Sequence, residues 1–295
     1  MSTKYQLRLG GYGPPTTSFS RALKFIGDRL EERFGDDLNV KYIWNIMDLG
    51  YRGEDILWLT EHGFLTIAYQ STSYLSDRVP ELGFVDLPFL FASNKAARSA
   101  IDGSLGDYLT SKIEGRINYR VLGYFENGFR HISNRLRPVR TPQDLKDMKI
   151  RILPSDVQAR TFELLGARPQ RMDLTEAIEG ITSGTLDAQE NPFANTVTYD
   201  IHKFHRHHTM SNHFYISRGI FMNRSAYYSY SDEMRNTLQE AVNEAVLIQR
   251  KQAENEAIES QKAIESEGSE IVKLTDEERT LFIDAVRPQL DEARH

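Results

Sequence analysis

The sequence lacks cysteine and any long apolar segment, and each absence excludes classes of protein. Without cysteine the chain has no disulfide scaffold, no zinc–thiolate site, no iron–sulfur cluster and no thiol nucleophile. No stretch approaches the roughly 20 apolar residues that a membrane-spanning helix needs. Residues 1–13 also lack the apolar run of a signal peptide, so we expect either a cytoplasmic protein or a mature chain.

Acidic residues outnumber basic ones, 42 to 36, for a formal net charge of −6. A protein that binds duplex nucleic acid usually carries a basic face, so general nucleic-acid binding is not expected. The net charge gives no long-range attraction for an acidic ligand either, and such a ligand would need local arginines. With 295 residues, 40% of them hydrophobic, the chain is long enough for one large domain or two smaller ones.

Strand and helix patterns alternate along the chain. Short apolar runs between turn residues predict strands at residues 5–9, 39–46, 64–69, 120–125, 148–153, 186–190 and 214–223. Apolar residues spaced three or four apart predict helices at residues 19–34, 54–62, 96–112, 155–165, 174–183, 231–267 and 276–290. This order predicts an α/β fold with mixed, mostly parallel sheets flanked by helices.

The helix predicted at 231–267 contains no proline or glycine and is longer than a single small domain requires. A coiled coil is the alternative, but its alanine-dominated heptads are weak. A helix that spans two lobes fits better. No flexible linker separates the lobes, so we predict several chain crossings. The predicted lobes are 1–126 plus about 214–250, and 127–213 plus about 251–295.

Two glycine-rich segments fail as catalytic or nucleotide-binding motifs. Gly10–Gly13 lies between a strand and a helix, but two prolines follow it and Thr16 stands where the dinucleotide fingerprint needs glycine. In Gly103-Ser104-Leu105-Gly106 the second glycine comes one residue too early for a nucleophile elbow. Neither a nucleotide cofactor nor serine hydrolase chemistry is expected.

Five of the eight histidines lie within the segment His202–His213. A metal site is one interpretation, because His205 and His207 would share a strand face. The other is a loop and strand with hydrogen-bonded imidazoles. No acidic residue stands between Asp200 and Asp232 to complete a typical ligand set. We therefore predict no metal, and a metal-dependent hydrolase stays open as the less favoured alternative.

Residues 142–192 contain an ordered series of motifs. They are Pro142-Gln143-Asp144-Leu145, Lys149-Ile150-Arg151, Leu165-Gly166-Ala167-Arg168-Pro169, Met172, Glu176, Gly184, Asp187 and Gln189-Glu190-Asn191-Pro192. Further matches stand at Asn127-Gly128-Phe129-Arg130, Ser133-Asn134, Lys203-Phe204 and Asn212-His213. In order and spacing, the chain resembles the periplasmic solute-binding subunits of TRAP (tripartite ATP-independent periplasmic) transporters, the DctP-type family. The resemblance covers essentially the whole chain.

The resemblance implies a two-lobed periplasmic-binding-protein-like fold with a long C-terminal helix spanning both lobes. It implies a receptor that captures an organic acid anion in an inter-lobe cleft by lobe closure and delivers it to the membrane subunits of a secondary transporter. No catalysis, cofactor or membrane insertion is implied. We expect a monomer in the periplasm, whose leader is absent from this sequence. A sensor that reports the ligand to a signalling partner fits the same binding physics.

Three polar residues are the main candidates for contact with the ligand carboxylate. Arg151 ends a predicted strand, where ligands collect in open α/β sheets, and its guanidinium can hold a carboxylate through two hydrogen bonds. The resemblance implies that Arg151 is this clamp and that the amide of Asn191 donates to the same carboxylate. Arg130 is a second candidate clamp, with a structural pair to a glutamate as its alternative.

The walls of the ligand site are less well defined by the sequence. Loop positions after the strands of the first lobe supply Tyr12, Tyr51, Tyr69 and Gln70, and Phe214 and Tyr215 are candidates for the wall. Such a wall favours an organic acid with an apolar or aromatic body. Leu174 stands where some family members place an aromatic ring over the ligand, Asp147 where many have glycine and Arg171 where many have proline. Because of these departures, the resemblance does not identify the ligand.

Overall fold

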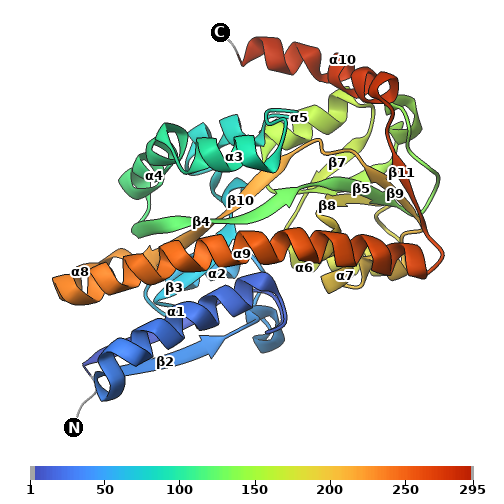
Figure 1. The fold of residues 1–295 in the computed structure, drawn as a ribbon. Coiled ribbons are helices and arrows are strands. Elements are labelled where there is room, and N and C mark those ends of the chain that lie inside the picture. Colours follow the sequence, from blue (N-terminus) through green and yellow to red (C-terminus); the bar gives the residue numbers. More distant parts are fainter. Residues whose placement is uncertain (1–3, 294–295) are drawn as a thin grey trace. The chain divides into compact units, whose positions relative to one another are not determined.

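The computed structural model describes residues 4–293, and their contacts divide the chain into two compact units (Figure 1). Unit 1 comprises Met1–Thr72, Ser104–Glu126 and Ser217–Glu254, and unit 2 comprises Ser73–Gly103, Asn127–Ile216 and Asn255–His295. The chain therefore passes repeatedly between the units. This division differs from the predicted lobes chiefly at Ser73–Gly103, which belongs to unit 2.

A five-stranded sheet in the order β2-β1-β3-β10-β4 contains the strands of unit 1. Its strands are β1 (Tyr5–Gly10), β2 (Leu38–Ile43), β3 (Ile67–Ser71), β4 (Tyr119–Phe129) and β10 (Tyr215–Asn223). β1 runs parallel to β2 and β3, whereas β10 runs antiparallel to β3. Both β4 and β10 continue from one unit into the other along the chain.

A six-stranded sheet in the order β11-β9-β5-β8-β6-β7 forms unit 2. Its strands are β5 (His131–Asn134), β6 (Lys149–Ile152), β7 (Arg168–Arg171), β8 (Ala188–Asn191), β9 (His207–Met210) and β11 (Glu270–Lys273). β5 is antiparallel to β8 and β9, and the other pairs are parallel. The prediction of mixed, mostly parallel sheets is confirmed.

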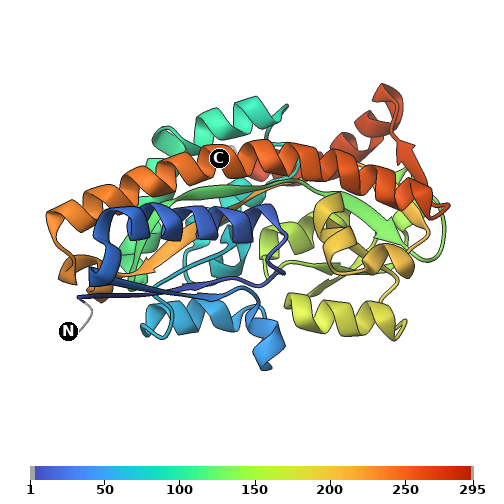
Figure 2. The ribbon, with the colours of Figure 1, turned by 60° about the horizontal axis from the view of Figure 1, so that its bottom comes forward.

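Unit 1 contains several helices and the first part of a long helix. They are α1 (Ser18–Phe34), α2 (Asp55–Glu61), α4 (Ser104–Arg116), α8 (Arg224–Ser229) and the part of α9 (Asp232–Ser266) that precedes residue 255. Thr17 caps α1 by accepting a hydrogen bond from the Ser20 amide, and Gly35 ends it at a φ of 47°. α1 lies beside this part of α9 in both ribbon views, and Arg29 of α1 pairs with Glu244 at 3.1 Å (Figures 1 and 2).

The helix predicted at 96–112 is in fact two helices. α3 (Asn94–Ile101) belongs to unit 2 and α4 belongs to unit 1. The amide of Asp102 closes α3 by donating to the Arg98 carbonyl, and Gly103 follows it. The apolar spacing continued across this break, so periodicity alone predicted one helix. The other helices of unit 2 are α5 (Asp156–Leu164), α6 (Leu174–Thr182), α7 (Phe193–Thr198) and α10 (Asp276–Glu292).

A hydrophobic core cluster of unit 2 lies on one face of its sheet. Ile150 and Ile152 of β6 point into a cluster that also contains Phe162 of α5 and Phe282 of α10. Figure 1 shows α10 next to α5, and Thr161 of α5 hydrogen-bonds to a side chain of α10. Because side chains alternate along a strand, Arg151 points to the opposite face of β6. The polar side chain of Arg151 therefore lies on the face of β6 opposite the core cluster.

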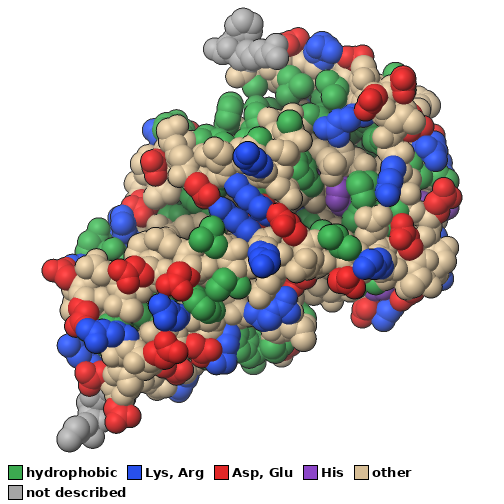
Figure 3. All heavy atoms as spheres, viewed as in Figure 1, with side chains coloured by type: hydrophobic (Ala, Val, Ile, Leu, Met, Phe, Trp, Pro, Cys, Tyr) green, Lys and Arg blue, Asp and Glu red, His purple; other side chains and the backbone are tan. Residues whose placement is uncertain are grey.

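Charged side chains of both signs are interspersed on the face shown in Figure 3. This arrangement suits a solvated exterior with an acidic excess. Of the helices in residues 4–293, not one combines the length and the apolar character needed to cross a membrane.

α9 offers a matched pair of leucines for testing the packing of unit 1. Leu238 is fully buried, whereas Leu247 is 67% exposed. We expect Leu238→Ala to lower the free energy of unfolding by about 2–5 kcal/mol, because it removes buried methyl groups and leaves a cavity. Leu247→Ala should change it by less than about 0.5 kcal/mol. Urea unfolding followed by circular dichroism measures both, and equal effects would contradict this packing of α9.

Candidate functional site

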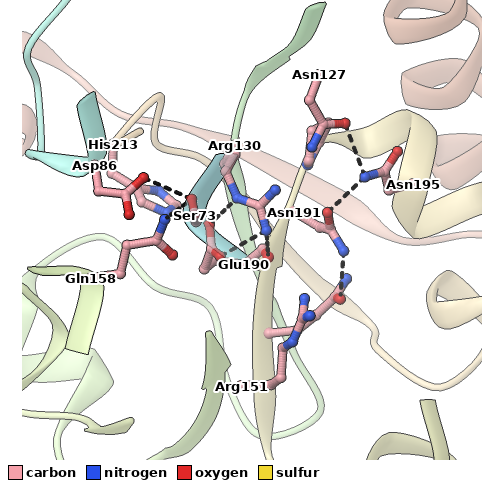
Figure 4. A network of polar contacts seen from close by, with 12 residues as sticks. Ser73, Asp86, Asn127, Arg130, Arg151, Gln158, Glu190, Asn191, Asn195 and His213 are labelled. Carbon is pink, nitrogen blue, oxygen red and sulfur yellow. Dashed lines mark hydrogen bonds and ion pairs between the residues drawn. The ribbon is translucent and has the colours of Figure 1, made fainter. Parts of the chain in front are cut away.

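A row of polar side chains crosses one face of the sheet in unit 2. Arg151 of β6 stands opposite Gln189 of β8, and Gln189 stands opposite Ser133 of β5. Directly paired residues on neighbouring strands share a face, and so does Asn191, two residues beyond Gln189. The structure therefore brings together two of the three main candidates, Arg151 and Asn191, on one face of unit 2 (Figure 4).

Arg151 is 1% exposed and meets only neutral acceptors within unit 2. Its Nε donates to the carbonyl of Met172 at 3.2 Å, and its Nη2 donates to the hydroxyl of Tyr74 at 3.1 Å. No carboxylate among residues 4–293 forms an ion pair with Arg151. Its guanidinium is therefore a buried charge whose remaining N–H groups are available to an anion.

A cluster of buried polar groups adjoins Tyr74 in the chain. The neighbouring Ser73 donates to Asp86 at 2.7 Å and accepts from Gln158 of α5 at 3.1 Å (Figure 4). Burial raises the pKa of Asp86 to about 6, although the surrounding hydroxyls counteract part of this shift. The Tyr74 hydroxyl also accepts from the amide of Leu174 at 3.0 Å. Leu174, another candidate, thus lies next to the Tyr74 hydroxyl that contacts Arg151.

Asn191 belongs to a chain of side-chain amides (Figure 4). Its Nδ2 donates to Gln189 at 3.2 Å, and its Oδ1 accepts from Asn195 at 2.9 Å. Asn195 also donates to the Oδ1 of Asn127, whose buried Nδ2 has no partner among the described residues. These bonds fix the orientation of the Asn191 amide and leave one of its N–H groups free to donate.

Arg130, the third candidate, is paired with an acidic side chain of its own unit. Its Nε donates to Glu190 Oε2 at 2.5 Å and its Nη2 to Glu190 Oε1 at 2.8 Å, with both residues fully buried. His213 contacts the same carboxylate at 3.1 Å. Burial alone would raise the pKa of Glu190, but the charge of Arg130 and the His213 hydrogen bond outweigh it and lower this pKa. The sequence analysis left this pairing with a glutamate open as the alternative to a ligand clamp at Arg130.

The candidates of unit 1 do not all lie together. Tyr12 and Tyr69 are buried with ring centroids 5.3 Å apart. Gln70 is also buried. Its side-chain amide donates to the Gly53 carbonyl and accepts from the Ser71 amide, so both of its ends are hydrogen-bonded to the backbone. Tyr51 is 42% exposed. Unit 1 also contains a buried arginine that the sequence did not single out, Arg218 of β10, whose guanidinium lies 4.6 Å from the Tyr12 ring centroid.

The two aromatic candidates that precede or begin β10 lie among other aromatic side chains. Phe214 belongs to the hydrophobic core cluster of unit 2, where it contacts Phe162 edge-on, which accounts for its burial by packing. Tyr215 makes edge contacts with Phe91 and Phe129.

Most imidazoles of the histidine-rich segment are buried and hydrogen-bonded. His205 precedes β9, so the expectation that it shares a strand face with His207 is wrong. Its Nδ1 bonds to the Ser133 hydroxyl, and His208 bonds to the His205 carbonyl. Within residues 4–293 no group of three histidine or acidic side chains could hold a metal ion. Burial lowers the pKa of both His131 and His205 to about 3 and that of His208 to about 4.

A family model and individual relatives agree in their match to this chain. The family described as "Bacterial extracellular solute-binding protein, family 7" (DctP) matches residues 9–295. The chain is 29% identical to the 2,3-diketo-L-gulonate-binding periplasmic protein YiaO of Escherichia coli, over 96% of this chain and 85% of the relative.

Solved structures share the fold over nearly the whole chain. The sugar acid binding protein DctPAm of Advenella mimigardefordensis, in complex with galactonate, has a TM-score of 0.92 and 24% identity, covering 97% of this chain and 92% of its own. A TRAP periplasmic solute-binding protein from Sulfurospirillum deleyianum with bound succinate has a TM-score of 0.90 and 25% identity, covering 99% and 96%.

The buried Arg130–Glu190 pair predicts a large cost for removing one partner. Glu190→Ala would leave the Arg130 charge buried without its carboxylate, so we expect the free energy of unfolding to fall by about 3–5 kcal/mol. The control is Glu259→Ala, which breaks an exposed pair with Lys262 and should cost at most about 1 kcal/mol. Chemical denaturation measures both variants. An equally small effect at Glu190 would show that Arg130 does not depend on this carboxylate.

The buried histidines predict a loss of stability in mild acid. Below pH 6.5 the unfolded chain takes up protons that His131, His205 and His208 cannot accept while buried, so the free energy of unfolding falls with falling pH. Each histidine contributes up to about 1.4 kcal/mol per pH unit. His205→Gln should therefore make the pH dependence less steep between pH 6.5 and 4.5 in urea unfolding, with His62→Gln on the exposed surface as control. Identical slopes in the wild type and His205→Gln would contradict this assignment.

Proposed function

Because the chain belongs to the DctP family of bacterial extracellular solute-binding proteins, we propose that it binds the carboxylate of an organic acid through Arg151 and Asn191 of unit 2. The family match confirms the resemblance found in the sequence motifs, together with the two-lobed fold, the solute-binding function and the periplasmic location that it implied.

The observation that carries the proposal is the burial of Arg151 without a counter-ion in unit 2. A buried guanidinium is costly unless acceptors meet its N–H groups, and a carboxylate is the acceptor that fits them best. Here the protein provides one carbonyl and one hydroxyl, both neutral. A ligand carboxylate would supply the missing negative charge, and the amide of Asn191 on the same sheet face would donate to it.

The proposed role is binding without catalysis. Neither a guanidinium nor a side-chain amide is a nucleophile, and both hold a carboxylate by hydrogen bonds alone. The nearby Asp86 is occupied by the Ser73 hydroxyl and does not belong to the row that contains Arg151. We therefore assign the protein the task of capturing its ligand unchanged.

The ligand class follows from the chemistry that these relatives share. The named relatives bind 2,3-diketo-L-gulonate, galactonate or succinate, and each of these ligands carries a carboxylate. For this chain the proposal is an organic acid anion. The apolar or aromatic ligand body that Tyr12 and Tyr69 suggested stays a prediction.

Delivery to the membrane subunits of a TRAP transporter is the proposed physiological role. A sensor that passes the ligand signal to another protein remains the second candidate, because both roles need the same binding site. Reconstitution with the membrane subunits in liposomes separates them: transporter function requires acid uptake that depends on this protein.

A substitution at Arg151 tests the proposed site. A thermal-shift screen over carboxylic acids first identifies a ligand, since a hundredfold excess over the dissociation constant stabilises the protein by about 2.7 kcal/mol. Arg151→Ala should then weaken binding of that acid by about 3–5 kcal/mol in calorimetry, because it removes one member of a buried charge pair.

Arg168→Gln is the matched control for Arg151→Ala. Arg168 lies on the adjacent strand β7, is 62% exposed in its side chain and pairs with Asp147. The Arg168→Gln variant should bind the acid with the affinity of the wild type. Near wild-type affinity in Arg151→Ala would remove Arg151 from the site, and a protein that responds to no acid would contradict the proposed function as a whole.

A further inference from the structure

Gln189 connects the proposed carboxylate site of unit 2 to the short helix α7. Its side-chain Nε2 donates to the hydroxyl of Thr196 in α7 at 3.1 Å and to the hydroxyl of Ser133 at 3.3 Å. Its Oε1 accepts from the Nδ2 of Asn191 at 3.2 Å. All four side chains are buried. Because both ends of the Gln189 amide are hydrogen-bonded, the orientations of Gln189 and Asn191 depend on each other.

A chain of side-chain amides can be hydrogen-bonded in two opposite directions. If the amides of Gln189, Asn191 and Asn195 all turned over, every donor would exchange with its acceptor and the bonds between them would remain. In the direction of this structure, Asn191 keeps an N–H group on Nδ2 that can donate to a carboxylate. In the opposite direction Oδ1 would stand where Nδ2 lies now, and it would repel a carboxylate. The direction therefore decides whether Asn191 can bind an anion.

Thr196 fixes this direction at one end of the chain. It has a single hydroxyl proton, which it donates to the carbonyl of Pro192, four residues earlier, at 3.3 Å. Toward Gln189 its oxygen can then only accept, so it requires the NH₂ end of that amide. Gln189 must consequently turn its Oε1 toward Asn191, and Asn191 must turn its Nδ2 toward Gln189.

Ser133, the other acceptor of Gln189, does not set the direction by itself. Its hydroxyl lies 2.8 Å from the Nδ1 of His205. A neutral His205 with its proton on Nε2 accepts from Ser133, whereas the other tautomer donates to it. Ser133 is thus compatible with both directions of the amide chain, and the hydroxyl of Thr196 is the group that distinguishes them.

We propose that Thr196 is a positioning residue for the carboxylate site and acts through Gln189 to present an N–H group of Asn191 to the ligand. The inference rests on the proposed function, because it assumes that Asn191 holds the carboxylate. Thr196 needs no contact with the ligand for this task. Its hydroxyl contributes by the direction of one hydrogen bond within unit 2.

Substitutions of Thr196 test the assignment through ligand affinity. Thr196→Val keeps the shape of the side chain and removes the accepting hydroxyl, so both directions of the amide chain become accessible. We expect acid binding to weaken about tenfold, the size of one hydrogen bond to a charged group. Thr196→Ser restores the hydroxyl and should stay within about threefold of the wild type. Calorimetry on the full chain measures both, with the acid that binds most tightly in a thermal-shift screen that includes succinate and galactonate.

Thr60→Val is the matched control for Thr196→Val. Thr60 of α2 is also buried, and its hydroxyl likewise donates to a carbonyl four residues earlier, that of Ile56, at 2.7 Å. It belongs to unit 1 and lies outside the amide chain. The control loses a buried threonine hydroxyl in the same way, but it should bind the acid within about twofold of the wild type.

A double-mutant cycle with Asn191→Ala distinguishes positioning from a purely structural effect. Asn191→Ala should by itself weaken binding about 10- to 100-fold. If Thr196 acts through Asn191, adding Thr196→Val to Asn191→Ala should change the affinity by about twofold or less. Thr196→Ala removes the same hydroxyl and replaces Thr196→Val in every comparison if the valine variant does not fold.

Three results would overturn the inference and leave the proposed function intact. They are wild-type affinity in Thr196→Val, failure of Thr196→Ser to restore binding, and a further tenfold loss when Thr196→Val is added to Asn191→Ala. Wild-type affinity in Asn191→Ala would overturn the inference together with the role assigned to Asn191. A protein that responds to no acid would remove the proposed function as a whole, and the inference with it.

Discussion

The cost of burying a guanidinium distinguishes three arginines of this chain by the acceptors that each one meets. Arg130 meets a full carboxylate in Glu190, so its charge is neutralised inside the fold. Arg151 meets a carbonyl and a hydroxyl, which satisfy two of its N–H groups and leave its charge unpaired. Arg218 meets only aromatic rings. A buried charge is destabilising until an opposite charge pairs with it. Arg151 and Arg218 are therefore the two of these three arginines at which an anion would stabilise the fold most.

The register of β8 keeps the neutralised arginine apart from the unpaired one. Side chains alternate along a strand, so Glu190 faces Arg130 while Gln189 and Asn191 face the side of Arg151. A shift of one residue would place the carboxylate of Glu190 on the Arg151 face. Glu190 could then pair with Arg151, and no ligand anion would be needed to neutralise it. Antiparallel pairing of β8 with β5 and parallel pairing with β6 fix this register from both sides. The strand pairing is thus part of what forms the proposed carboxylate site.

The sequence predicted the fold class because the fold class depends on local signals. Apolar spacing identified most helices and strands. It placed Arg151 in a predicted strand and Asn191 directly after one, and the structure has both residues within strands. Contacts between distant segments carry no such signal. The Arg130–Glu190 pair joins residues 60 positions apart, and Arg218 lies in a largely apolar strand without any motif. The break between α3 and α4 was missed for a related reason, because the apolar spacing continues through it.

The net charge of −6 describes the surface of the protein and says little about its binding site. Exposed acidic side chains such as Glu259 are in solvent, where ions screen their effect within about 8 Å at physiological ionic strength. Buried charges are screened far less, so Arg151 and Arg218 determine the local potential although they are few. The buried histidines add no compensating charge, since burial keeps them neutral. The proposed carboxylate site at Arg151 is therefore compatible with an acidic protein, because the charge of Arg151 is not neutralised within its unit.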